Sequence, residues 1–230
     1  MKFGIVVFPG SNCDHDAYHA ASVNAGFGAQ YLWHKDTLIP DDIDCIILPG
    51  GFSYGDYLRC GAVAQFSPLM KEVKKFAENG KFVVGICNGF QILTETGMLP
   101  GALLKNENLN FICKDTNLKV ISNDSAFTSA YKKGDVINIP IAHGEGNYYA
   151  DADTLKMLED ENLIVFKYSS HDGIIEKQYN PNGSVNNIAG IISKKGNVLG
   201  MMPHPERYSD KQLGCNDGVN IFKSIARSLS

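Results

Sequence analysis

The sequence lacks long hydrophobic runs and any excess of positive charge. No apolar segment approaches the roughly 20 residues that a membrane-spanning helix needs, so we expect no membrane contact. The chain carries 21 Lys and Arg against 25 Asp and Glu, a net charge of −4. The chain therefore has no excess of positive charge that would favour binding to the phosphate backbone of nucleic acid. The first apolar run is too short for the core of a signal peptide, so we expect a cytoplasmic protein.

Sequence patterns for metal and nucleotide binding are also missing. None of the six cysteines belongs to a CxxC pair or matches a zinc-ligand spacing; they stand at positions 13, 45, 60, 87, 113 and 215. In a reducing compartment they should be free thiols, most of them small buried hydrophobic side chains. The chain has no GxxxxGK[ST] segment for ATP. We therefore expect no metal site and no cofactor in this chain.

Short runs of β-branched residues alternate with helical stretches along the first half of the chain. Strands are predicted at 2–8, 29–34, 44–51 and 81–87, and helices at 13–24, 67–79 and 88–97. This alternation predicts an α/β fold, a flavodoxin-like, doubly wound and mostly parallel sheet with helices on both faces.

The second half is less regular. Strand-like segments at 118–122 and 136–142 are separated by turns rich in Asn, Ser and Gly, which predicts a small antiparallel addition to the sheet. Further strands are expected at 163–169, 187–193 and 197–203, followed by a closing helix at 218–229. No linker interrupts the pattern, so we expect one domain over residues 1–230.

The segment FVVGICNGFQIL places Cys87 in a G-x-C-x-G turn between a predicted strand and a predicted helix. Gly85 and Gly89 permit the close backbone approach that such a sharp turn requires. The helix N-terminus favours a thiolate over a thiol. The N–H of Asn88 can stabilise an oxyanion there. The alternative is a buried structural cysteine at the end of a strand.

A nucleophilic thiol needs a base, and His204 in the segment PHPER is the candidate among six histidines. In an extended segment, His204 and Glu206 would project to the same side. Glu206 could then orient the imidazole and stabilise its charged form. The alternative is a surface turn with an incidental histidine.

The segment LPGGFSYGD is the third part of the pattern. A predicted strand ends there in Gly50 and Gly51, at the edge where open α/β sheets bind ligands. Backbone N–H groups of glycines are unobstructed, so Gly51 is the natural second oxyanion donor beside Asn88. The alternative is a flexible glycine turn.

These three motifs, read in order as GGFSYGD, GICNGFQ and PHPE, resemble the class I (triad) glutamine amidotransferases. The resemblance implies that Cys87, His204 and Glu206 are catalytic. It also implies that Gln91 and Gly50 contact the substrate, glutamine.

Further segments resemble, more narrowly, the glutamine amidotransferase subunits of phosphoribosylformylglycinamidine synthases, which act in purine biosynthesis. These segments are FPGSNCD, GGFSYGDYLRCGAVA, NLNFIC and AHGEGNYYAD. The resemblance implies a free-standing subunit that hydrolyses glutamine through a cysteine thioester. The ammonia would go to a synthetase that uses ATP to convert formylglycinamide ribonucleotide to formylglycinamidine ribonucleotide. It also implies two partners, a large synthetase subunit that carries ATP and Mg²⁺ and a small bridging subunit.

Other functions are compatible with the same residues. The alternatives are an amidotransferase of another pathway, a related cysteine hydrolase of γ-glutamyl compounds, and a non-catalytic subunit that binds glutamine. His143 is as well explained by a structural loop as by function, and Asp14, His15 and Asp16 fit the start of a helix. Cys60 has no assigned role.

Overall fold

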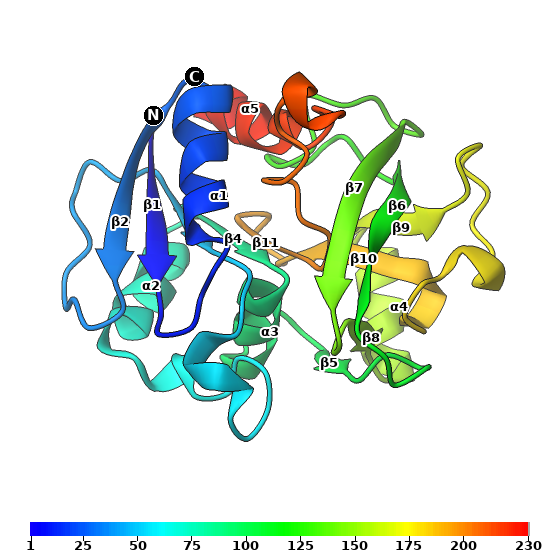
Figure 1. Cartoon of the computed structure of the whole chain (residues 1–230), viewed down its shortest axis with the longest axis horizontal. Helices are drawn as coiled ribbons and strands as arrows, with labels where there is room; N and C mark the ends of the chain where they lie inside the picture. Colours follow the sequence, from blue (N-terminus) through cyan, green and yellow to red (C-terminus); the bar gives the residue numbers. More distant parts are fainter. Residues whose placement is uncertain (230) are drawn as a thin grey trace.

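The computed structural model describes residues 1–229 and contains a nine-stranded mixed sheet (Figure 1). The strand order is β2-β1-β3-β4-β11-β10-β9-β6-β7, and β5 and β8 form a separate two-stranded ribbon. This architecture confirms the predicted α/β fold and its mostly parallel sheet with helices on both faces.

The parallel part of the sheet contains the most uniformly apolar strands. Each neighbouring pair from β2 to β11 is parallel, so their carboxyl ends meet at one edge. All four residues of β3 are buried, as expected for a strand with helices on both faces. The strands are β1 (Lys2–Val7), β2 (Gly28–Trp33), β3 (Cys45–Leu48), β4 (Phe82–Ile86) and β11 (Val198–Met201).

The remaining strands of the sheet pair antiparallel, beginning with β10 against β11. In β7, buried and half-buried residues alternate along the whole strand, the pattern of a sheet with one face on the core. This addition is more extensive than the sequence suggested. It consists of β10 (Ile188–Ile192), β9 (Ile164–Ser169), β6 (Ile112–Val120) and β7 (Val136–His143), while β5 (Ala102–Leu104) pairs with β8 (Asn147–Tyr149).

Helices cover both faces of the parallel strands. Figure 1 shows α1 and α5 together in the upper part of the view and α2 and α3 below the strands. The ring of Phe3 in β1 contacts Phe222 in α5, while α3 packs on β3, β4 and β11. The helices are α1 (Asp14–His19), α2 (Pro68–Glu78), α3 (Asn88–Glu95), α4 (Ala152–Asp160) and α5 (Val219–Ser228); α1 continues as a π-helical turn, Ala20–Asn24.

The starts of α2 and α4 are stabilised differently. Ser67 immediately precedes α2, but its hydroxyl does not cap the helix; it lies 2.8 Å from the hydroxyl of Tyr54. The sequence pattern did not predict α4, although Asp151 caps it by accepting the N–H of Thr154 at 2.8 Å. None of the helices within residues 1–229 is long and apolar enough to cross a membrane.

Candidate active site

Cys87 lies on a sharp turn between β4 and α3, as the G-x-C-x-G pattern predicted. Its backbone has φ +50° and ψ −104°, which non-glycine residues rarely adopt. It occupies the position just before α3, where the helix dipole favours a negative charge on the sulfur. The residue is 5% exposed. The turn therefore presents a nearly buried thiol at the carboxyl edge of the parallel strands.

The two glycines of the motif are required by space. A Cβ on Gly89 would lie 1.9 Å from the carbonyl oxygen of Leu48 at the end of β3. A Cβ on Gly85 would lie 2.6 Å from the carbonyl oxygen of Gly89. Both distances are far shorter than a carbon–oxygen contact allows, so the strand, the turn and the start of α3 can pack this closely only with glycine at both positions.

His204 follows β11, the parallel neighbour of β4, so the topology delivers it to the same edge as Cys87. The N–H of Cys87 donates to the carbonyl of Met201 at 2.8 Å, which fixes the turn to the strand that leads to His204. Although β7 is last in the strand order, it also reaches the site. Its Pro140 carbonyl accepts the His204 N–H at 2.8 Å, and its Ala142 carbonyl lies 3.7 Å from the Cys87 sulfur.

His204 and Glu206 form a buried ion pair. Nδ1 of His204 is 2.6 Å from Oε1 of Glu206, and each side chain is 1% exposed. The sequence predicted that His204 and Glu206 project to the same side of an extended segment, but this segment is not extended. It is a turn, in which the Arg207 N–H bonds back to the His204 carbonyl, and the turn itself brings the pair together.

The charge environment of His204 favours the imidazolium. Burial alone would lower the pKa of His204, but the negative charges of Glu206 and Cys87 raise it well above its usual range. Nε2 of His204 is buried and has no hydrogen-bond partner within residues 1–229. The ring nitrogen on the side away from Glu206 is thus free to exchange a proton with the thiol or a substrate.

The Gly50–Gly51 pair lies between His204 and the loop that follows β1. A Cβ on Gly50 would lie 2.6 Å from Cε1 of His204, so this glycine makes room for the imidazole. Gly51 has φ +132° and pairs with Ser11 in a short bridge, whose two bonds are donated by the N–H groups of Phe52 and Cys13. Neither bond uses the N–H of Gly51.

A cavity of about 230 Å³ opens beside the Cys87 thiol. Among the predicted site residues, Gly51, Cys87 and Gln91 line it. The others do not: they are Gly50, Asn88, His204 and Glu206. Its remaining wall comes from the loop after β3, the segment before β6 and the turn after β7. That wall includes Phe52, Asp56, Cys60, Phe111, His143 and Glu145.

The amide side chains of Gln91 and Asn88 connect these walls. The amide nitrogen of Gln91 donates to the backbone carbonyl of Glu145 at 2.7 Å, and its oxygen accepts from Asn88 at 2.9 Å. The oxygen of Asn88 accepts the backbone N–H of Ser53 at 3.3 Å. Gln91 therefore lines the cavity and also holds α3 against both loops, while its contact with a substrate stays a prediction.

His143 is fixed in the cavity wall by two buried amides. Its Nδ1 faces the oxygen of Asn106 at 3.1 Å, and its Nε2 faces the amide nitrogen of Asn182 at 3.4 Å. Burial, together with the positive charge of His204, lowers the pKa of His143 to about 4. A neutral imidazole held at both nitrogens supports the wall and is not a proton shuttle. His15, the other open case, lies beside Tyr31 on the exposed surface.

Cys13 and Arg207 are neighbours of the triad that no sequence pattern singled out. Arg207 donates to the Cys13 sulfur at 3.2 Å, and the ligand atoms of Cys13, His204 and Glu206 all lie within 4.8 Å of one another. The guanidinium beside the sulfur opposes cation binding, because it already supplies positive charge there. The motif FPGSNCD was the available signal, but only the fold shows that it contacts the triad.

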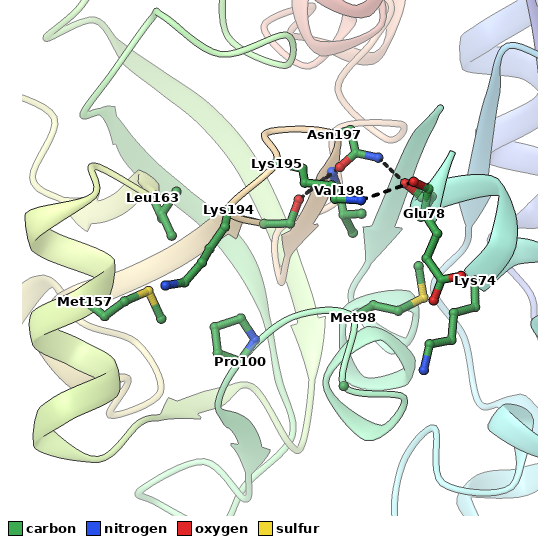
Figure 2. A pocket seen from close by; sticks show the side chains of 13 residues that line it. Lys74, Glu78, Met98, Pro100, Met157, Leu163, Lys194, Lys195, Asn197 and Val198 are labelled. Atoms are coloured by element: carbon green, nitrogen blue, oxygen red, sulfur yellow. Dashed lines mark hydrogen bonds between the residues drawn. The ribbon is translucent and has the colours of Figure 1, made fainter. Parts of the chain in front are cut away.

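A second cavity, of about 390 Å³, lies at the other end of β11 between α2, α4 and the segment after α3 (Figure 2). Its walls are mainly apolar and include Met98, Pro100, Met157 and Val198. Figure 2 shows Asn197 bonded across its edge, where the amide donates to the carbonyl of Ala77 at 2.7 Å. No cysteine or histidine lines this cavity within residues 1–229.

The fold and the site together indicate the class of protein to which the chain belongs. A thiol on a strand–helix turn of a doubly wound sheet, next to a buried His–Glu pair, is suited to covalent acyl transfer through a thioester. Residues 1–215 match the family of CobB/CobQ-like glutamine amidotransferase domains. The chain belongs to this family of glutamine amidotransferases.

Solved structures agree with this assignment. PurLQS from Thermotoga maritima is 47% identical, with a TM-score of 0.88 over 100% of this chain and 99% of that chain. This match confirms the resemblance to the amidotransferases of phosphoribosylformylglycinamidine synthases.

Two more distant structures share the fold. One, described as belonging to a GMP synthase from Thermoplasma acidophilum, is 14% identical, with a TM-score of 0.63 over 100% of this chain and 96% of that chain. The other, a glutamine amidotransferase from Thermotoga maritima, is 16% identical, with a TM-score of 0.55 over 89% of this chain and 76% of that chain.

Proposed function

We propose that this chain is the glutaminase of a phosphoribosylformylglycinamidine synthase and that Cys87, His204 and Glu206 perform its reaction. The observation that carries the proposal is the thiol of Cys87, on its strained turn, beside a cavity and a buried His204–Glu206 pair. The full-length similarity to PurLQS supports the choice of pathway.

The reaction begins when the Cys87 sulfur attacks the side-chain carboxamide carbon of glutamine. The N–H groups of Gly51 and Asn88 stabilise the oxyanion that forms, and loss of one such donor typically costs about a hundred- to a thousandfold in rate. His204 gives its proton to the departing nitrogen, so ammonia leaves and a γ-glutamyl thioester remains on Cys87.

Hydrolysis of the thioester completes the cycle. His204, now neutral, removes a proton from water, and the hydroxide attacks the thioester carbonyl. Glutamate then leaves. His204 is protonated again and Cys87 is again a thiolate, as at the start of the cycle. Glu206 orients the imidazole through Nδ1 and stabilises its positive charge during both half-reactions.

The surface around the cavity fits a partner that receives the ammonia. Exposed apolar side chains lie on two segments that line the cavity, and the rings of Phe52 and Phe111 in its wall stack with centroids 6.5 Å apart. We define this apolar rim as Phe52, Tyr57, Leu58, Leu109 and Phe111, which are 46%, 76%, 92%, 77% and 55% exposed. An apolar patch beside a reaction site is typical of a protein interface.

The partner of this proposal is a large synthetase subunit that binds ATP and Mg²⁺, with a small bridging subunit in the same assembly. Docking over the apolar rim would keep ammonia from being protonated and lost in bulk water. All six cysteines are free thiols, which supports a reducing, cytoplasmic location.

The test uses the reconstituted complex and two nitrogen sources. A Cys87→Ala variant should lose glutamine-dependent formation of formylglycinamidine ribonucleotide by at least about 10³-fold. The same complex should keep its activity with added ammonium, because the synthetase is intact. Cys113→Ala, which removes an exposed thiol elsewhere, is the matched control. A Cys87→Ala complex that still uses glutamine would refute the proposal.

A further inference from the structure

Three polar side chains in the wall of the Cys87 cavity take no part in the reaction steps above. They are Asp56 and Cys60, from the loop after β3, and Glu145, from the turn after β7. About 90 residues separate the two carboxylates in the sequence, yet the fold places both on the cavity that holds the nucleophile.

Within residues 1–229 these carboxylates lack a directly paired cation, although the charge of Glu145 interacts with that of Arg59 at longer range. Neither Asp56 nor Glu145 forms a salt bridge with any residue of the described chain, 1–229. The neighbouring cation, Arg59, is paired instead with Glu95. The amide nitrogen of Asn88 lies 3.5 Å from Oδ1 of Asp56.

The two carboxylates and the thiol influence one another. Burial raises the pKa of Asp56, as does the charge of Glu145, and a hydrogen bond from Cys60 opposes the rise. Burial and the two carboxylates raise the pKa of the Cys60 thiol, so it stays protonated and donates. His143 is neutral because its pKa is low, and no Lys or Arg lines the cavity in the described residues. The wall therefore carries negative charge that no direct ion pair within residues 1–229 neutralises.

Glutamine brings the complementary charge. Its carboxamide must reach Cys87, and its α-ammonium lies at the other end of a short aliphatic chain. We propose that Asp56 and Glu145 bind this α-ammonium group, and that they make the site selective for an α-amino acid over a simple amide. The protonated Cys60 thiol interacts with both carboxylates and can donate its single S–H to one of them at a time. This inference rests on the proposed function, in which glutamine occupies the cavity.

The experiment compares L-glutamine with glutaramate, the same amide without the amino group, in the reconstituted complex. The variants are Asp56→Asn and Glu145→Gln, which remove charge and keep size. Asparagine also tolerates the left-handed φ of +55° at position 56. Glu107→Gln is the control, because that carboxylate is exposed, pairs with Lys177 and does not line the cavity.

Wild type should prefer glutamine over glutaramate by at least about 100-fold in kcat/KM, because two charged contacts are lost with the ammonium. Each variant should lower kcat/KM for glutamine by about 10- to 100-fold through KM, and leave glutaramate hydrolysis unchanged. The selectivity ratio then collapses in the variants and not in the control.

Two results would overturn the inference. Wild type could hydrolyse both amides equally well, or each variant could lower both rates by the same factor, which would indicate a structural role. A different result would mark failure of the proposed function itself. In that case wild type would hydrolyse neither substrate while the complex still used ammonium.

Discussion

At the scale of the residue, Cys87 combines backbone strain with a favourable charge environment. A non-glycine residue in so unusual a φ/ψ region costs about 1–3 kcal/mol, which the packing of neighbouring elements has to offset. In return, the thiol lies at the start of α3 and near a His204 whose pKa is raised. The strain is localised at the residue that we propose as the nucleophile.

His143 gives a prediction about stability in acid. Its pKa is about 4 in the folded chain and 6.5 when unperturbed, so the unfolded chain takes up a proton first as the pH falls. This neutral imidazole contributes its full share of stability above pH 6.5 and loses it as the pH falls toward 4. The whole difference corresponds to roughly 3 kcal/mol, with about 2 kcal/mol lost by pH 5.

The measurement is the free energy of unfolding in urea at pH 7.5 and pH 5, for wild type and His143→Asn. The variant has no imidazole to titrate, so its loss between the two pH values should be smaller by about 2 kcal/mol. The raised pKa of His204 means that its own contribution is lost as the pH rises above 6.5, and this change cancels in the comparison because both proteins carry His204. Equal losses in both proteins would contradict this account of His143.

At the scale of the element, the active site depends on how closely β3, β4 and α3 approach. Gly89 permits the approach of α3 to β3, and Gly50 permits that of His204. The loop after β3 is held by another buried contact, in which the hydroxyl of Tyr54 lies 2.7 Å from Nδ1 of His34. Several loop residues, including Tyr54 and Asp56, keep left-handed backbones with this support.

Gly89→Ala tests the close approach directly. The new methyl group would overlap the Leu48 carbonyl, so we expect a loss of at least about 2–3 kcal/mol in the free energy of unfolding. Gly144→Ala is the control, because a Cβ there would meet only Phe111, at 3.8 Å. Thermal and urea unfolding measure both variants. Similar stability of the two would show that the space at Gly89 is not limiting.

The sequence predicted the parallel strands and their helices well, because continuous apolar runs and glycine caps are local signals. It predicted the Cys87 turn for the same reason. It could not show that β7, last in the strand order, returns to contact His204 and Cys87. It also missed Asp56, Glu145 and Cys13, since their importance comes from long-range contacts and not from any spacing in the sequence.

At the scale of the whole molecule, the cavity opens beside the apolar rim and not into a closed interior. The rim belongs to two segments, the loop after β3 and the segment before β6, that also form walls of the cavity. A partner bound there would contact the same loops that hold the substrate. Docking and glutamine hydrolysis are therefore coupled in this account.

Leu58→Asp tests the docking surface. Leu58 is 92% exposed, so the substitution should leave the fold of the isolated chain unchanged. A charge in the apolar interface should weaken co-purification with the synthetase by about 10-fold or more. Val23→Asp, at a 65% exposed position after α1, is the control. Unchanged binding of the Leu58→Asp chain would place the interface elsewhere.

The central claim is that Cys87 forms a covalent γ-glutamyl intermediate, and mass spectrometry of the intact complex tests it most directly. The complex, incubated with glutamine and quenched in acid during turnover, should carry a γ-glutamyl thioester, and a His204→Asn variant should form less of it because it lacks the proton donor for the departing ammonia. Peptide mapping should place the added mass on Cys87, and Cys87→Ala should show none. An adduct on another cysteine, or turnover of glutamine by Cys87→Ala, would contradict the account.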